Sequence, residues 1–360
     1  MEKQHQIFFE FLRFSIGSES EIPSSLKEAD WKELYRIAQK QCLVGILFDG
    51  IQKLPPAEMG MSKDLLLQWM MQCQMLEKAN VRLNDAVIQV SEWFRKKGFR
   101  TCILKGQGNA LMYPNPYSRT PGDIDIWVEG GDKRVISFVR SISPHEKACY
   151  HHIEFPSYKG VEVEVHYRPS FLLCFWHDRK LQKYYERVKE EQFSHRVMLG
   201  EQGEIAIPTV EFNLIFQLTH IYAHLMNEGI GLRQLLDYYY VLISDDLLLI
   251  RDRVQKELKE LGLWKFAGAI MYIMQEVFGM PASRLIVPPN EKYGRFVLNE
   301  VLEAGNFGKH DARNRFGRSQ LGHNLQRVYR DIRLVRYFPA EALSEPIFRT
   351  WHFFWRLRYK

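Results

Sequence analysis

The spacing of hydrophobic and polar positions changes twice along the chain, and the first long stretch has helical spacing. Apolar residues between Ile37 and Leu47 recur close to the spacing of one helix face. Residues 65–97 continue as one long run with few helix breakers, and Gly98 is placed to end it. Residues 1–98 are therefore predicted to be helical.

Short apolar runs follow, and they predict a small sheet. Residues 100–104 and 124–128 are runs of strand length, and residues 161–166 alternate strictly between apolar and polar side chains. A turn-rich stretch at 113–123 separates the first two runs, and residues 133–142 have the pattern of a helix. This part of the chain is predicted to combine strands and helices.

Beyond Pro208 the pattern returns to helices, expected at 210–227, 231–243, 246–261 and 264–278. Three prolines then mark a linker before a basic, aromatic tail, at Pro281, Pro288 and Pro289. The chain is thus predicted to have an α+β fold, with a small mixed-sheet domain between two helical regions. The expected divisions are an N-terminal helical region at 1–98, the α/β core at 99–207, a helical domain that walls a cleft at 208–280, and the linker and tail at 281–360.

The composition is that of an ordinary globular protein, with 46% hydrophobic and 26% charged residues. No run reaches the roughly 18 uncharged apolar residues of a membrane span, and the N-terminus lacks the pattern of a secretory signal. The cysteines are odd in number and never lie in C-x-x-C spacing, which argues against a disulfide framework or a zinc site. We therefore expect a cytoplasmic protein with free cysteines, at Cys42, Cys73, Cys102, Cys149 and Cys174.

Basic charge is concentrated in the C-terminal tail. Residues 309–360 carry twelve Lys or Arg against four Asp or Glu, while the whole chain has a formal charge of +6. Leu325, Val328 and Ile332 belong to an apolar helical stripe, with arginines on another side and aromatic residues beyond. The tail is expected to dock through its aromatic residues and leave its arginines in water. The alternatives are an anionic membrane surface or nucleic acid, and nucleic acid is disfavoured because the rest of the chain is nearly neutral.

Two aspartates in the run at 122–128 are the centre of the candidate chemistry. In a strand, Asp123 and Asp125 face the same way, about 6–7 Å apart at Cα, while the apolar residues between them pack into the core. Such a pair can hold divalent ions, and Mg²⁺ commonly uses one or two carboxylates together with substrate phosphates. The alternative is an incidental pair on a solvated edge strand.

A lysine and a glycine precede this strand by about 18 residues. Lys105 and Gly106 follow a predicted strand and open a predicted helix, where glycine allows the backbone to approach a ligand closely. The Lys105 ammonium would add a positive charge for a polyphosphate. The alternative is an ordinary surface lysine before a glycine turn.

The alternating run at 161–166 offers a third carboxylate. Glu162, Glu164 and His166 share one face, and the intervening valines face the core. If this run lies beside the strand of Asp123, one of its glutamates completes a trio that can bind metal and act as a base. A half-exposed strand with polar residues facing outward explains the same alternation.

These motifs together resemble a known superfamily. The run LKGQGNALMYPNPYSRTPGDIDIWV at 104–128, followed by VEVHYRP at 163–169, is similar to the DNA polymerase β-type nucleotidyltransferases. More narrowly, it resembles an uncharacterised bacterial group with the same lysine-glycine turn, arginine, D-x-D strand and glutamate-apolar-histidine strand. The wider superfamily has glycine-serine at the position of Lys105 and Gly106, where the serine contacts phosphate.

The resemblance implies a magnesium-dependent (or manganese-dependent) enzyme that uses an NTP, with ATP expected. It would transfer a nucleoside monophosphate to an unspecified acceptor and release pyrophosphate. The implied catalytic and metal-binding residues are Asp123, Asp125 and Glu164, with Glu162 as the less favoured third carboxylate. The implied nucleotide-binding residues are Lys105, Gly106, Arg119 and His166. The competing hypothesis is a catalytically inactive nucleotide- or protein-binding module that keeps the fold.

Other polar residues carry weaker signals. His220 and His224 lie on a polar stripe of a predicted helix, which either faces a cleft, holds buried histidines or, least favoured, binds zinc. Arg233 and Asp237 are spaced as a helical ion pair, although a role in substrate binding is also open. His151 and His152 sit at the start of a strand and are assigned no role.

Overall fold

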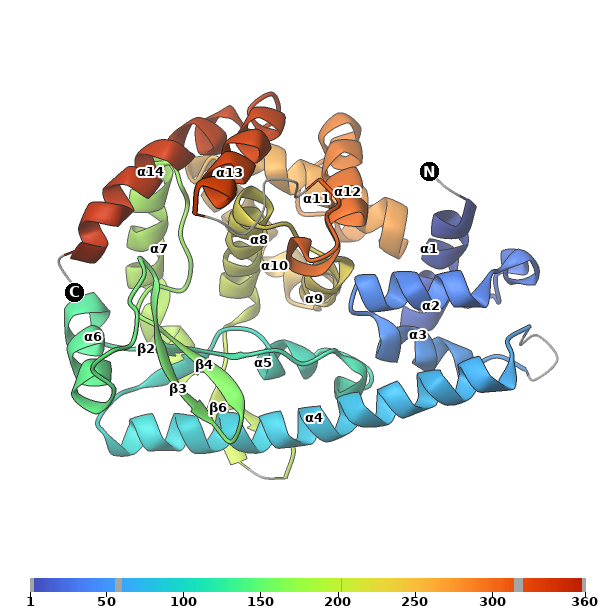
Figure 1. The fold of residues 1–360 in the computed structure, drawn as a ribbon, viewed down its shortest axis with the longest axis horizontal. Helices are drawn as coiled ribbons and strands as arrows, with labels where there is room; N and C mark the ends of the chain where they lie inside the picture. The colour runs from blue at the N-terminus through green and yellow to red at the C-terminus, as the bar shows by residue number, and fades with distance from the viewer. Residues whose placement is uncertain (1–2, 56–59, 202, 314–319, 358–360) are drawn as a thin grey trace.

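The computed structural model describes residues 3–55, 60–201, 203–313 and 320–357, and over these residues the chain has the predicted α+β fold (Figure 1). The N-terminal helices are α1 (Lys3–Ile16), α2 (Trp31–Lys40), α3 (Val44–Ile51) and α4 (Lys63–Lys96). A four-stranded mixed sheet follows, made of β1 (Thr101–Ile103), β2 (Ile124–Val128), β3 (His152–Tyr158) and β4 (Val161–His166).

Helix α4 joins the two halves of the molecule. It runs for 34 residues, or about 50 Å, beneath the sheet and out to the N-terminal helices (Figure 1). The Ser62 hydroxyl accepts a hydrogen bond from the backbone N–H of Leu65 and caps the helix start. Trp69 belongs to the large helical core, whereas Phe94 belongs to the core beneath the sheet. The long helix predicted at 65–97 is confirmed.

The sheet has the order β1-β2-β4-β3, so β2 and β4 are its central strands. Strand β2 pairs antiparallel with β1 and parallel with β4, and β4 pairs antiparallel with β3. All five residues of β2 are buried, which means that both of its faces are covered. The alternative of a solvated edge strand for the aspartate pair is therefore wrong.

The connections of the sheet carry short helices. After β1 come the single turn α5 (Gln107–Ala110) and a 3₁₀ turn at Pro116–Ser118, and α6 (Gly131–Ile142) follows β2. Helix α7 (Phe175–Ser194) and the hairpin β5 (Arg196–Leu199) and β6 (Gly203–Ala206) lead out of the domain, and none of these three was predicted. Residues 133–142 were predicted as a helix, which α6 confirms.

The helices after the sheet domain bury apolar side chains on most of their surface. They are α8 (Val210–Asn227), α9 (Leu232–Leu242), α10 (Leu247–Glu260), α11 (Trp264–Phe278) and α12 (Glu291–Ala304). The first four confirm the predicted helices within two residues at each end. Helix α12, which packs on α11, was missed because Pro288 and Pro289 were interpreted as the start of a linker.

The tail docks on the body, as expected, through α13 (Gln320–Leu334) and α14 (Pro339–Leu357). Phe348 of α14 is buried and stacks on Phe171 with 5.2 Å between ring centroids. The expectation that the tail arginines stay in water is wrong for Arg330, whose guanidinium donates to the carbonyls of Asn227 and Glu228. These carbonyls end α8 and lack helical partners, so a buried cation is favourable there.

The apolar stripe of α13 lies on the exposed side of the helix, whereas Arg330 is buried. Leu325, Val328 and Ile332 are exposed, because α13 turns its Arg330 side toward α8. No helix among the described residues is both long and apolar enough to cross a bilayer.

The close approach of α3 to the 3₁₀ turn at Pro116–Ser118 gives a first prediction. A Cβ on Gly45 would lie 2.2 Å from the backbone carbonyl oxygen of Ser118. Alanine gains about 0.5–1 kcal/mol of helix propensity, but a clash with a backbone atom costs about 1–3 kcal/mol. Gly45→Ala should therefore lower the free energy of unfolding, measured by urea denaturation. Gly60→Ala is the control, because its Cβ would lie 3.4 Å from the nearest atom, Trp31 Nε1. Equal stability of the two variants would contradict the close approach of Gly45 to Ser118.

Two carboxylates face each other between α13 and α14 and give a second prediction. Burial, and then the charge of Glu345, raises the pKa of Asp331 from 3.8 to about 7. Between these values the folded chain keeps a proton that the unfolded chain releases, so stability falls as the pH rises and the penalty is complete above pH 7.

Asp331→Asn removes this penalty. The variant should melt at a higher temperature than the wild type at pH 8, and the difference should vanish toward pH 4. Asp252→Asn, at an exposed position of α10, should not change the pH dependence. A constant difference between Asp331→Asn and the wild type across this range would rule the carboxylate contact out.

Candidate functional site

The structure brings three predicted carboxylates together at one end of the central strands. Asp123 directly precedes β2, Asp125 lies within it, and Glu164 lies opposite Asp125 on β4. One oxygen from each of the three lies within 4.8 Å of the others. Glu162, the less favoured alternative, is exposed and is not part of this group. The parallel pairing of β2 with β4 creates the trio, since neither strand alone carries all three residues.

Asp125 is the most enclosed of the three, with 1% of its surface exposed. Its Oδ1 accepts hydrogen bonds from His166 Nε2 at 3.0 Å and from Lys105 Nζ at 3.1 Å. Its Oδ2 is buried and has no hydrogen-bond partner among the described residues. A buried carboxylate oxygen without a donor is costly unless a cation approaches it.

The charges of the site explain its protonation. Burial would lower the pKa of His166, but hydrogen bonds to Asp125 and Glu164 outweigh burial and raise it to about 9. Burial likewise lowers the pKa of Lys105, yet the charges of Asp125, Asp123 and Glu164 raise it overall. Three carboxylates thus face two cations, which leaves a net negative charge.

Glu164 stays ionised for the same reason. Burial would raise its pKa, but the hydrogen bond from His166, 3.4 Å away, and the nearby His152 lower it to about 2. Three ionised carboxylates and one unpartnered oxygen fit a hard divalent cation, because Mg²⁺ and Mn²⁺ prefer oxygen ligands. Asp123, Asp125 and Glu164 are the residues that could hold it.

The lysine and glycine predicted to bind phosphate lie beside the carboxylates. Gly106 has φ +64° at the start of α5, a backbone conformation that favours glycine. The Lys105 ammonium lies between two partners, Asp125 and His220 Nε2, which is 3.2 Å away. Because an ammonium has three donors, it can keep these contacts and still donate to a ligand.

Arg119 is placed differently from a free phosphate-binding arginine. Its Nε and Nη2 each donate to Asp237 at 2.8 Å, and the pair is buried. Tyr113 also donates to Asp237, at 2.6 Å. The i, i+4 pair predicted between Arg233 and Asp237 is thus replaced by a long-range pair, and Arg233 donates instead to the Thr120 carbonyl. The Arg119 guanidinium binds both carboxylate oxygens of Asp237 at once, which is the strong, bidentate form of such a pair.

The polar stripe of α8 faces the carboxylates, which settles the alternatives left open for it. Gln217 and His220 line a small cavity of 30 Å³ beside Asp123 and Asp125. His220, His224 and Asn227 line an adjoining cleft of 590 Å³ that also contains Glu164 and His166. His220 and His224 are in no candidate metal group among the described residues. Burial holds the pKa of His220 well below its usual range.

The outer wall of the larger cleft comes from the tail. Arg327 of α13 and Phe348, Arg349 and His352 of α14 line it opposite the sheet. The docked tail therefore closes the cleft that the sheet and α8 open.

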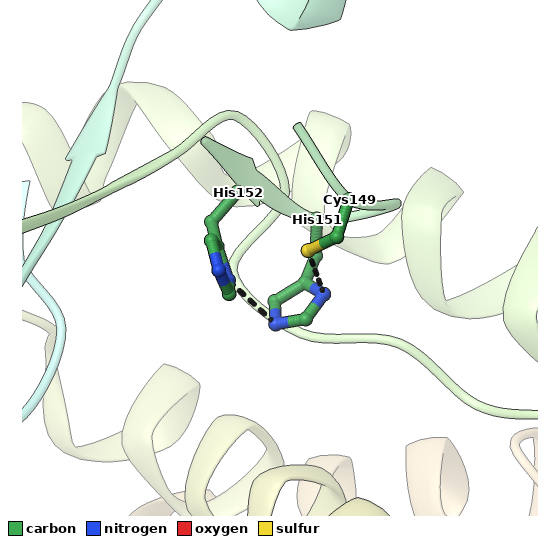
Figure 2. A group of neighbouring side chains, drawn as sticks. All are labelled: Cys149, His151 and His152. Atoms are coloured by element: carbon green, nitrogen blue, oxygen red, sulfur yellow. Dashed lines mark hydrogen bonds between the residues drawn. The ribbon is translucent and has the colours of Figure 1, made fainter. Parts of the chain in front are cut away.

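Three residues of this cleft were not predicted as functional. Cys149, His151 and His152 precede or begin β3 and point toward one another (Figure 2). Their short C-x-H-H spacing was the available signal, and a search for C-x-x-C pairs overlooks it.

The small mixed sheet walled by helices has the architecture that the resemblance to nucleotidyltransferases implies, and three carboxylates converge from its central strands. The chain belongs to a family described as uncharacterised nucleotidyltransferase, whose sequence pattern matches residues 27–279. No curated protein matches it. Among solved structures it is similar to an antigenic nucleotidyltransferase-like protein from Paracoccidioides brasiliensis, with 16% identity and a TM-score of 0.28, over 50% of this chain and 92% of that chain.

The buried ion pair gives a third prediction. Removing one partner of such a pair leaves an uncompensated charge and costs about 3–5 kcal/mol. Asp237→Ala should therefore lower the free energy of unfolding by about this amount in urea denaturation. Asp245→Ala removes a fully exposed partner of Arg284 and should leave stability unchanged. Equal effects of the two substitutions would show that the Arg119–Asp237 pair does not hold the site together.

Proposed function

We propose that the chain is a Mg²⁺-dependent, or Mn²⁺-dependent, enzyme that moves a nucleoside monophosphate from an NTP, first of all ATP, to an acceptor hydroxyl. Pyrophosphate is released. The proposal places the family within the DNA polymerase β-type superfamily and the chain in its bacterial group. It also places the protein in the cytoplasm, which is supported by the five cysteines, all free thiols.

The observation that carries the proposal is the convergence of Asp123, Asp125 and Glu164 within 4.8 Å. Asp125 Oδ1 is held by Lys105 and His166, and its buried Oδ2 has no hydrogen-bond partner among the described residues. In this role the three carboxylates are the metal ligands. Divalent ions bound there supply charge stabilisation for the attacking and leaving oxygens of the transfer. The low pKa of Glu164 suits a ligand better than a base, because a base needs a pKa nearer the working pH.

The acceptor oxygen forms a bond to the α-phosphorus of the NTP, the bond from that phosphorus to the bridging oxygen breaks, and pyrophosphate leaves. The acceptor proton passes to solvent. Lys105 binds the polyphosphate through a free ammonium hydrogen, and Gly106 lets the backbone approach it.

The other predicted nucleotide-binding residues have narrower roles in this proposal. His166 is buried against Asp125 and Glu164, so it orients these carboxylates and reaches nucleotide only from the cleft side. Arg119 lines the small cavity, but Asp237 occupies its Nε and Nη2. Its Nη1, which makes a 3.4 Å contact to the Thr120 carbonyl, and the second Nη2 hydrogen are left for a phosphate.

The competing function is an inactive binding module with the same fold. A module without catalysis has no need for three ionised carboxylates held in register, since clustered like charge destabilises the folded chain. The complete trio therefore favours the enzyme.

Two glutamates on one strand allow a matched test. Purified wild type, Glu164→Gln and Glu162→Gln are melted with each NTP, with and without Mg²⁺. A ligand at a hundredfold excess over its Kd stabilises the folded chain by about 2.7 kcal/mol. The wild type and Glu162→Gln should show a Mg²⁺-dependent rise in Tm with at least one NTP, and Glu164→Gln should lose it because a metal ligand is gone.

Pyrophosphate release with the NTP that binds then tests turnover. No Mg²⁺-dependent rise with any NTP in the folded wild type would reject the nucleotide site. Equal rises in both glutamate variants would reject Glu164 as a ligand. Binding without pyrophosphate release across a screen of hydroxyl acceptors would support the inactive module.

A further inference from the structure

A second cluster of side chains that could hold a metal ion adjoins Glu164 through His152, whose Nδ1 lies 3.4 Å from the Glu164 carboxylate. Cys149, His151 and His152 each offer one ligand atom, and these atoms lie within 4.8 Å of one another. Figure 2 shows the His151 ring between the other two side chains, with Cys149 Sγ 3.5 Å from His151 Nδ1 and His152 Nδ1 3.0 Å from His151 Nε2. None of the three belongs to the carboxylate trio.

The backbone holds this cluster in place. The Cys149 N–H donates to the His152 carbonyl at 2.9 Å, which closes a tight turn before β3. The His151 carbonyl accepts from the N–H groups of Tyr167 and Arg168, just beyond β4. The hydroxyl of Tyr167 also donates to the Cys149 carbonyl. The turn is thus fixed to the central strand that carries Glu164, and its side chains lose little freedom on binding an ion.

The donor atoms differ in kind from those of the carboxylate trio. One thiol and two imidazoles are softer ligands than carboxylates, and they select Zn²⁺ over Mg²⁺. With bonds of about 2.3 Å to sulfur and 2.0–2.1 Å to nitrogen, neighbouring ligands of a tetrahedral ion lie about 3.3–3.7 Å apart. One nitrogen of each histidine and the Cys149 sulfur lie within 4.8 Å of one another, so small rotations of the side chains would bring them to the spacing that a tetrahedral ion requires.

All three residues line the 590 Å³ cleft. A tetrahedral ion bound by three protein ligands keeps a fourth position, and here that position opens to the cleft. Structural zinc sites are closed by four protein ligands, whereas sites that bind water or substrate have three. The arrangement therefore suits an ion that meets a ligand from the cleft.

We propose that Cys149, His151 and His152 form a binding site for a thiophilic divalent cation of the zinc type, separate from the carboxylate site and with one coordination position open to the cleft. The site stands on its own donors and does not depend on nucleotide transfer. Metal binding releases the thiol proton to solvent, and each neutral imidazole keeps one N–H on the ring nitrogen that does not bind the ion.

Two other groups among the described residues could compete for the same ion. His152 forms one with Glu164, 3.4 Å away, and His166, but the His166 Nε2 is already hydrogen-bonded to Asp125. Cys174, His177 and Glu341 also have ligand atoms within 4.8 Å. The Glu341 carboxylate, however, already accepts hydrogen bonds from the N–H groups of Leu173 and Cys174 at the start of α7. Those donors would have to be given up, which makes the Cys149 cluster the better site.

Co²⁺ is the probe, because a thiolate bound to Co²⁺ absorbs in the near ultraviolet and a tetrahedral complex absorbs in the visible. The full chain is treated with chelator and titrated with Co²⁺. The wild type should show both absorptions with the intensity of one thiolate-bound Co²⁺ per chain, in addition to any Co²⁺ that the carboxylate trio binds, and Zn²⁺ should remove them. Cys149→Ser should lose the thiolate band. His151→Asn and His152→Asn should weaken binding by more than about 100-fold, since loss of a residue that only orients a ligand costs about 10- to 100-fold.

Matched variants separate this site from its neighbours. Cys174→Ser and Asp123→Asn should both keep the thiolate band, since the first belongs to the competing group and the second to the carboxylate trio. Absence of the band in the wild type at saturating Co²⁺ would overturn the proposal, and so would its loss in Cys174→Ser with retention in Cys149→Ser.

A measurement on the wild type alone guards against variants that fail to fold. Alkylation of each cysteine is followed by peptide mass spectrometry with and without Zn²⁺. Zn²⁺ should protect Cys149 and leave the rate at Cys73 unchanged. Equal rates of alkylation at Cys149 in both conditions would reject the metal site and leave the three side chains as a hydrogen-bonded cluster only.

Discussion

A carboxylate that is nearly sealed from water stays ionised only beside compensating positive charge, and Asp125 has two such neighbours in Lys105 and His166. These partners come from opposite sides of β2, one after β1 and the other at the end of β4. The charge of Asp125 is therefore compensated only if β2 lies between β1 and β4 and pairs with β4 in this register. Glu164 shares His166 with Asp125, so the same contact also places the third carboxylate.

The helical regions make this small sheet into a site. Helix α4 belongs to both cores, and the Arg119–Asp237 pair ties the loop before β2 to α9. Helix α8 then presents its polar stripe to the carboxylates, and the docked tail closes the cleft. The resulting cleft is bounded by elements from four parts of the chain, and Lys105 lines it together with residues of α14.

Much of the fold could be predicted because it depends on local periodicity. Residues 124–128 and 161–166 were predicted as strands with the bounds that the structure has, and the helices of 210–278 were placed almost as well. The aspartates and Glu164 were also found, since alternation along a strand places residues two apart on one face. The turn at 149–152 and the burial of Arg330 were missed, because each depends on a partner far away in the chain. Helix α12 was missed because Pro288 and Pro289 were interpreted as part of a linker.

The sequence by itself determined the α+β class, the long helix, the carboxylate-bearing strands and the family resemblance, because periodicity and short motifs are properties of neighbouring residues. Tertiary structure alone decided which groups meet. It placed Asp125 opposite Glu164 on the neighbouring strand and His152 beside Glu164. It also formed the ion pair of Asp237 with Arg119 and not with Arg233. The physical reason is that charge compensation and metal ligation act over a few ångströms in space, whatever the separation along the chain.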